Sequence, residues 1–325
     1  MPFHRNRLQT DQKLRTGAPP WCGAVARAFL AVATAALPVA SISAQPALQL
    51  TRTQLTDRID VFSGFTNGNV LSIRSDTGTL LVDAQSARRV GLVDSALTAL
   101  NAPRVKLIIN THYHSDHIEG NAHFRAKGAR VLAHENVAKQ AVKDTTIESW
   151  ENWHRTAAIP EAMPTMGFRE SAVLRFGTEE VRVLHAPNAH TDGDAIIWLP
   201  RSNILHIGDI FELNAEPFID WWVGGSLAGM IAAVDRVLAM TDDRTRVVPG
   251  HGPVSDRATL ISYRAMLGTM QTRVLAAIDA GKSLDELLAT HPTAEFDERL
   301  GGARHGERLT RLIYVGLARR STGTG

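Results

Sequence analysis

Residues 111–117 read Thr-His-Tyr-His-Ser-Asp-His, and four of these side chains can bind a divalent metal ion. They directly follow an apolar run, Val105 to Asn110, which predicts a buried strand. Imidazole nitrogens and a carboxylate at this spacing suit zinc, or less often iron. In an extended loop His112 and His114 point the same way, and Asp116 and His117 lie one turn further on. One short segment can therefore supply two adjacent ions. A polar loop of surface histidines is the alternative, and an H-x-H-x-D-H string just past a strand is too specific for it.

Two coordination shells need more ligands than this segment holds, and three later segments supply candidates at the ends of predicted strands. These candidates are His190, Asp209 and His251. Each follows an apolar or alternating run that is broken by Gly or Pro. Loops at the strand ends of a rigid sheet usually carry the residues of a site assembled from distant segments. The sequence therefore predicts a mixed nitrogen and oxygen site with positions open for water and substrate.

The ordered set H-x-H-x-D-H, His, Gly-Asp and Gly-His-Gly resembles the metallo-β-lactamase superfamily over roughly Asp60 to Asp256. The resemblance implies an α/β (α+β) fold, the αββα sandwich of two mixed β-sheets flanked by helices, with its site along one edge. It assigns His112, His114 and His190 to one zinc ion, Asp116, His117 and His251 to a second, and Asp209 to a bridging position. The cofactor expected is Zn²⁺, two ions per subunit.

Such a pair of ions implies a zinc-dependent metallohydrolase. Zinc lowers the pKa of bound water from about 15.7 toward 7, which gives metal-bound hydroxide at neutral pH. Asp116 is predicted both to ligate and to orient this nucleophile, which makes it the candidate catalytic residue. The carboxylates of Asp116 and Asp209 offset charge that imidazoles alone would leave strongly self-repelling.

The substrate is predicted to be a small molecule with an activated acyl bond: a lactam, lactone, ester or thioester. One subclass of metallo-β-lactamases carries cysteine at the position of Asp209 and lysine three residues later, where this chain has Glu212. A bridging aspartate is instead typical of glyoxalase II-like thioesterases, lactonases and phosphodiesterases. Residues 120–124 and 195–200 look closer to the cysteine subclass and its exported relatives, so β-lactam is the leading single substrate.

Two other classes of function stay open. Superfamily relatives use similar His/Asp sets around iron, either to oxidise persulfides or to reduce oxygen. His117 and His251 favour the hydrolase because a second metal needs them. A non-catalytic metal-binding protein is the other alternative, and the complete ligand set argues against it.

Two loops are expected to shape the substrate cleft. The first, residues 65–69, contributes Phe65 and Asn67 and joins two early strands through a turn. The second follows Asp209 and contributes Trp221 and Trp222 on a glycine-rich segment, which suggests an apolar wall. These tryptophans can equally pack beneath the loop as a small satellite core.

Residues 1–44 have the features of a secretory signal peptide. Basic residues precede an alanine-rich apolar stretch, and small residues close it at Ser41 to Ala44. The apolar run is short for spanning a bilayer.

The net charge of the whole chain is +2, and residues 1–44 alone carry +4, so the remaining residues carry −2. This charge gives no reason to expect binding to nucleic acid. Cys22, the only cysteine, also lies in the leader. The mature protein is expected to be periplasmic or secreted, without a membrane anchor, and its oligomeric state is open.

The remaining chain, residues 45–325, is predicted to be one metallo-β-lactamase-like domain, with a core at about 58–256 and a C-terminal helical extension at 257–325. Strands are expected at 59–63, 70–75, 79–83 and 246–249. Helices are expected at 87–100, 226–240, 256–280, 283–290 and 307–320. Residues 144–170 are the least regular and predict a lid or a helical excursion.

Overall fold

The structure is a computed structural model that describes residues 50–64, 67–148, 150–213 and 215–321. These described residues form one compact unit. The predicted leader lies outside the described residues. Within those residues, no helix combines the length and apolar character needed to cross a bilayer.

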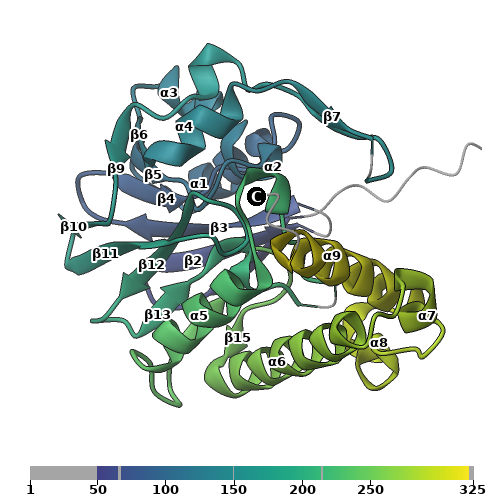
Figure 1. Cartoon of the computed structure of the whole chain (residues 1–325). Helices are drawn as coiled ribbons and strands as arrows, with labels where there is room; N and C mark the ends of the chain where they lie inside the picture. The colour runs from purple at the N-terminus through teal and green to yellow at the C-terminus, as the bar shows by residue number, and fades with distance from the viewer. Residues whose placement is uncertain (1–49, 65–66, 149, 214, 322–325) are drawn as a thin grey trace, which may run out of the picture. The chain divides into compact units, whose positions relative to one another are not determined.

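Two β-sheets form the centre of this unit (Figure 1). The described residues place seven strands in the first sheet, in the order β1 (Thr51–Gln54), β2 (Ile59–Gly64), β3 (Asn67–Arg74), β4 (Thr79–Val82), β5 (Val105–Ile109), β6 (Arg130–His134) and β9 (Met166–Phe168). The second sheet has the order β10 (Ser171–Phe176), β11 (Glu179–Ala186), β12 (Asp194–Leu199), β13 (Ile204–His206), β14 (Arg246–Val248) and β15 (Ser255–Asp256). Both sheets are mixed, because β4, β5, β6 and β9 pair in parallel and so do β13 and β14.

The alternation of side chains along the strands fixes the layers of the sandwich. In β12, Ala195, Ile197 and Leu199 face the first sheet, where they join apolar residues of β2 to β6. Ile196 and Trp198 face the opposite way, against the helices outside. All six residues of β12 are buried, as expected for a strand covered on both faces.

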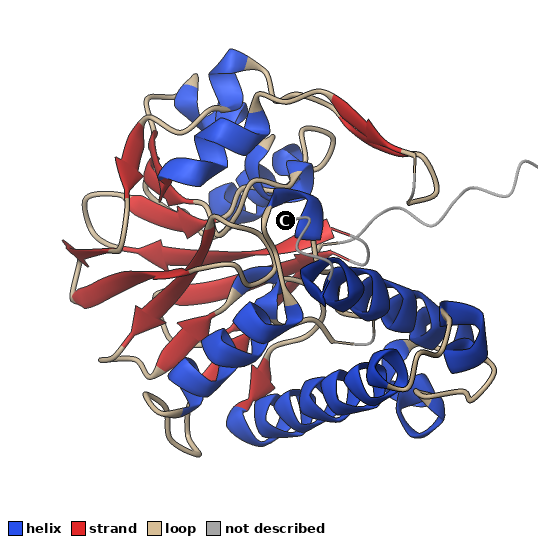
Figure 2. Cartoon of the chain, in the orientation of Figure 1, coloured by secondary structure: helices blue, strands red, loops and turns tan. Residues whose placement is uncertain are grey.

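Helices cover the two outer faces (Figure 2). On the first sheet lie α1 (Val90–Ala99) and α3 (Asn121–Arg125), with α4 (Glu135–Ala141) near the site. On the second sheet lie α5 (Leu227–Leu238) and α6 (Arg257–Asp279), and α9 (Ala303–Ser321) packs against α6 together with α7 (Leu284–Leu288) and α8 (Asp297–Leu300). The αββα fold that the sequence predicted is therefore confirmed, including the C-terminal helices.

Capping residues and helical spacing in the sequence predicted most helix ends to within a few residues of their observed positions. Ser226 and Asp256 cap α5 and α6, since their side chains accept hydrogen bonds from the backbone N–H groups of Gly229 and Thr259. The expected start of the first helix was wrong. Residues 87–89 form a turn, and α1 begins only at Val90.

The described part of residues 144–170 is not a helical excursion. It forms a two-stranded hairpin, β7 (Thr145–Ile147) and β8 (Trp153–Arg155), then a 3₁₀ turn and β9. Strand β9 pairs with β6 and so extends the first sheet. A strand of three residues is too short to show the alternation of apolar and polar side chains that identifies a strand in the sequence. Its conformation depends instead on the strand with which it pairs.

Candidate metal centre

The seven predicted ligands converge at one edge of the sandwich from four separate segments. One group comprises His112, His114, His190 and Asp209, and an adjoining group comprises Asp116, His117 and His251. Within each group the ligand atoms lie within 4.8 Å of one another. Four strand ends deliver them: β5 leads to the H-x-H-x-D-H segment, β11 to His190, β13 to Asp209 and β14 to His251.

The first group brings three ring nitrogens together. Nδ1 of His114 lies 3.0 Å from Nε2 of His112 and 3.0 Å from Nε2 of His190. In a tetrahedral zinc site with Zn–N bonds of about 2.0–2.1 Å, ligand nitrogens are separated by ~3.3 Å. The three rings therefore have the spacing of ligands around one ion.

Hydrogen bonds on the far side of each ring decide which nitrogen faces the cluster. Nδ1 of His190 donates to the carbonyl oxygen of Phe218 at 2.7 Å, and Nε2 of His114 donates to Asp220 at 3.2 Å. In the neutral form of such a ring, which carries one N–H, the nitrogen that faces the cluster is unprotonated. Lone pairs held 3.0 Å apart repel one another unless a cation lies between them, so this geometry fits a metal ion.

Asp83 fixes two further rings. Its Oδ2 accepts from Nδ1 of His117 at 2.8 Å and from the hydroxyl of Thr111 at 2.7 Å. Thr111 Oγ1, its own proton committed, accepts from Nδ1 of His112 at 3.0 Å. Both rings thus turn Nε2 toward the cluster, and Nε2 of His117 is buried with no hydrogen-bond partner in the described chain. Outer contacts of this kind are typical of metal-binding histidines.

Asp209 lies between the two groups. Its Oδ2 is 3.5 Å from Nε2 of His112, and its Oδ1 is 3.3 Å from Nε2 of His117. Nε2 of His251 is 3.3 Å from both Asp209 Oδ2 and Asp116 Oδ2. A carboxylate with one oxygen toward each group has the placement of a bridging ligand.

The charges of the cluster are arranged to receive cations. Burial lowers the pKa of His112 well below its ordinary value and lowers that of His190 to about 4, so both rings are neutral. Burial has the same effect on His251, but Asp209 outweighs it and raises the pKa of this ring to about 9. Burial would also neutralise Asp209, yet the neighbouring histidines hold its pKa well below the usual range. Carboxylates that draw protons onto nearby rings provide the same attraction for a metal ion.

A buried network beneath His114 was not predicted from the sequence. Asp220, which is fully buried, accepts hydrogen bonds from Tyr113 and His114 and pairs with Arg155 at 3.6 Å. Arg155 also donates to the hydroxyl of Tyr113 at 2.6 Å. Tyr113 sits inside the motif, but its partners come from β8 and from residue 220, and no spacing rule connects such distant positions.

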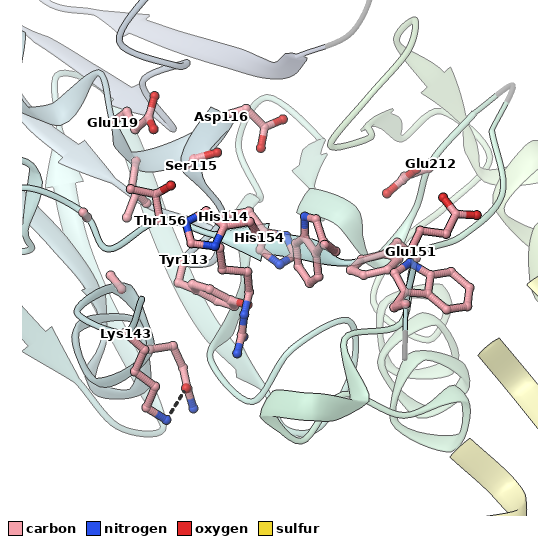
Figure 3. A pocket seen from close by; sticks show the side chains of 18 of the residues that line it. Tyr113, His114, Ser115, Asp116, Glu119, Lys143, Glu151, His154, Thr156 and Glu212 are labelled. Carbon is pink, nitrogen blue, oxygen red and sulfur yellow. Dashed lines mark hydrogen bonds between the residues drawn. The ribbon is translucent and has the colours of Figure 1, made fainter. Parts of the chain in front are cut away.

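A cavity of about 550 Å³ opens beside the cluster, and Figure 3 shows part of its lining. Trp150, Trp153 and Phe218 form its apolar wall. The predicted residues Trp221 and Trp222 do not line it. They border a second cavity of about 480 Å³, between the 3₁₀ turn Trp221–Val223 and α9, and the Trp222 ring packs behind Phe218 with centroids 6.4 Å apart.

The other predicted substrate loop is only partly described. Phe65 lies outside the described residues, as does the side chain of Asn67, whose backbone begins β3. Gly68 nevertheless lies beside the cluster, since its N–H donates to Asp116 at 3.1 Å. A Cβ at Gly68 would lie 2.4 Å from Cε1 of His117, so this close approach requires glycine.

Comparisons with known proteins agree with this architecture. The profile of the metallo-beta-lactamase superfamily matches residues 63–251. The chain is 23% identical over 198 residues to the metallo-beta-lactamase type 2 of Bacillus cereus, covering 59% of this chain and 70% of that protein. It is 25% identical over 203 residues to the acyl-coenzyme A thioesterase MBLAC2 of Gallus gallus, covering 56% and 72%. It is 27% identical over 222 residues to the hydroxyacylglutathione hydrolase of Methylococcus capsulatus, covering 63% and 77%.

Solved structures share the fold. A metallo-beta-lactamase from Pontibacter korlensis aligns with a TM-score of 0.55 at 21% identity, over 68% of this chain and 99% of that one. The inverting sec-alkylsulfatase Pisa1 from Pseudomonas sp. aligns with a TM-score of 0.64 at 16% identity, over 85% of this chain and 51% of that one. The sandwich, the clustered histidines and aspartates, and the profile match define a metal-binding hydrolase fold. The chain belongs to the metallo-beta-lactamase superfamily and is a hydrolase-type member of it.

Proposed function

We propose that this protein is an exported dinuclear zinc hydrolase of activated acyl bonds, with β-lactams as the leading substrate. The observation that carries the proposal is the convergence of ring nitrogens from His112, His114, His117 and His190 around Asp209. When bound, zinc supplies Lewis-acid polarisation of the substrate carbonyl and ionisation of water near neutral pH. Relatives that are metallo-beta-lactamases, an acyl-coenzyme A thioesterase and a hydroxyacylglutathione hydrolase support acyl hydrolysis.

The chain's own residues would divide the remaining work. His112, His114 and His190 would hold one ion, Asp116, His117 and His251 the other, and Asp209 would bridge them. The side chain of Asp116 is 24% exposed and lines the cavity, so it can hold a proton or orient water next to substrate. Trp150, Trp153 and Phe218 would exclude water from the apolar part of the substrate.

A hydrolysis panel with metal quantification tests the proposal. The purified protein, loaded with zinc and stripped by chelator, would be assayed with a chromogenic cephalosporin, a carbapenem, an aliphatic lactone, S-lactoylglutathione and a phosphodiester. We expect zinc-dependent turnover of the cephalosporin or carbapenem. Turnover of only a lactone or thioester would reject the β-lactam assignment and keep acyl hydrolysis. Bound iron together with oxygen uptake would contradict the hydrolase.

Export is a separate part of the proposal and rests on residues 1–44. Its test is the N-terminal sequence of the protein recovered from the periplasm or medium of an expressing bacterium. We expect a chain that begins close to residue 45. Recovery of the uncleaved chain from the cytoplasm alone would reject export.

A further inference from the structure

The aromatic wall of the cavity beside the metal centre is held by the C-terminal helix α9, which lies outside the segment matched by the family profile. Arg308 of α9 lines this cavity together with Trp150 and Glu151 of the β7–β8 hairpin and Glu216 of the loop after Asp209. Figure 3 places Asp116 and His114 on one side of the cavity and Glu151 and Glu212 on the other. Three segments distant in sequence therefore meet at this cavity.

Arg308 contacts all of these segments at once. Its Nε lies 3.0 Å from Oε1 of Glu216, and its Nη1 lies 3.7 Å from Oε2 of Glu151. Its guanidinium carbon lies 5.5 Å from the centre of the Trp150 ring, within the range of a cation–π contact. A second residue of α9, His305, also contacts the carboxylate of Glu216.

The burial of these partners separates this cluster from ordinary surface ion pairs. The side chain of Glu216 is only 12% exposed and that of Arg308 is 31% exposed, whereas Glu151 is 63% exposed. Exposed pairs contribute little because solvent screens them, so the inner contact with Glu216 and the stacking on Trp150 carry most of the interaction. A planar guanidinium can make both contacts together, which an ammonium cannot.

Trp150 in turn belongs to the aromatic wall. Its ring centre lies 6.4 Å from that of Phe218, and Phe218 lies 5.1 Å from Trp153. Trp153 lies 5.7 Å from the ring of His114. The wall thus runs continuously from a candidate metal ligand to the guanidinium of Arg308.

We propose that Arg308 is a positioning residue that fixes this wall as the binding surface for an aromatic or apolar acyl group of the substrate. The proposal rests on the hydrolase proposed above and adds the chemical class of the acyl group. Because the guanidinium is already paired with the carboxylate of Glu216, the group that it helps to bind is uncharged. The acyl carbonyl would lie at the metal centre, and the apolar part would extend along Phe218 and Trp153 toward Trp150.

Matched substrate pairs test the inference. Benzylpenicillin carries a phenylacetyl group that 6-aminopenicillanic acid lacks, and the phenylacetyl thioester of N-acetylcysteamine carries a phenyl group that its acetyl thioester lacks. Burying a phenyl group contributes about 1.5–3 kcal/mol, which predicts a ~10–100-fold higher kcat/KM for the phenylacetyl member. In Arg308→Gln we expect this ratio to fall about tenfold, with the loss in KM rather than kcat. Arg311→Gln, an exposed arginine on the same helix, is the matched control.

Hydrogen exchange gives a readout that does not depend on turnover. We expect faster exchange in peptides that cover β8 in Arg308→Gln and no change in Arg311→Gln. An unchanged substrate ratio with unchanged exchange would overturn the inference, and so would an equal loss of kcat/KM on both members of a pair. A wild-type protein that hydrolyses neither pair would count against the proposed acyl hydrolysis, and the exchange result would still decide the role of Arg308.

Discussion

Replacing Asp220 with asparagine tests how the fold prepares His114 to bind metal. Asp220 is fully buried, and its Oδ2 accepts a hydrogen bond from Nε2 of His114 at 3.2 Å. The other ring nitrogen of His114, Nδ1, therefore faces His112 and His190. Burial would raise the pKa of Asp220, but its bonds with His114 and Tyr113 hold the pKa below the usual value. Asparagine keeps the shape, removes the charge, and can present its own N–H groups to His114 and reverse the tautomer.

The expected effect is large enough to measure by two methods. Outer partners of metal-binding histidines contribute about 10–100-fold to metal affinity, which corresponds to roughly 1.4–2.7 kcal/mol. Loss of charge-assisted hydrogen bonds would lower the free energy of unfolding of the metal-free protein by about 1.5–3 kcal/mol. Zinc affinity would be measured by competition with a chromophoric chelator, and stability by chemical denaturation with and without zinc.

The matched control is Asp235→Asn, which breaks an exposed ion pair with Arg264 on the outer helices. We expect this control to keep wild-type zinc affinity and to lose no more than about 1 kcal/mol of stability. Wild-type zinc affinity in Asp220→Asn would show that the orientation of His114 does not depend on this buried carboxylate.

Three further predictions concern the same centre. Asp116→Asn should lower kcat by roughly 100-fold or more while the free energy of unfolding changes by less than about 1 kcal/mol, and near-wild-type kcat would remove its proposed role. Gly68→Ala should displace the ring of His117, so the number of zinc ions bound per chain, measured by mass spectrometry, should fall below that of the wild type. An unchanged number would show that the backbone at residue 68 can shift to make room for the methyl group. Burial lowers the pKa of His206 to about 4, so its neutral ring favours folding above pH 6.5 and this contribution is lost as the pH falls from 6.5 toward 4. In His206→Asn the free energy of unfolding of the metal-free protein should fall less between pH 6.5 and pH 4, by up to about 3 kcal/mol. The same fall as in the wild type would contradict the lowered pKa of His206.

The cluster could be predicted from sequence because its signals are local. Each candidate ligand follows an apolar run that ends at Gly, Pro or the motif itself, and sheet geometry then brings the strand ends to one edge. Asp83 also follows a strand, β4, and its carboxylate contacts the ring of His117. His206, the last residue of β13, is buried and lies outside both ligand groups.

The surroundings of the cluster could not be predicted in the same way. The contacts of Asp220 with Tyr113 and of Arg308 with Glu216 join residues that are 107 and 92 positions apart, and no periodicity encodes them. The apolar wall illustrates the same limit. Two tryptophan pairs stand in the sequence, and tertiary packing alone places Trp150 and Trp153 in the cavity beside the cluster while Trp221 and Trp222 border another.

Anomalous X-ray diffraction at the zinc edge, on crystals of the zinc-loaded protein, shows directly whether these side chains hold two ions. We expect two peaks, one bound by His112, His114 and His190, the other by Asp116, His117 and His251, and both within reach of Asp209. The absence of any peak between these side chains would rule out a zinc centre at this edge of the sandwich. A single peak bound to His112, His114 and His190 would reject the dinuclear centre.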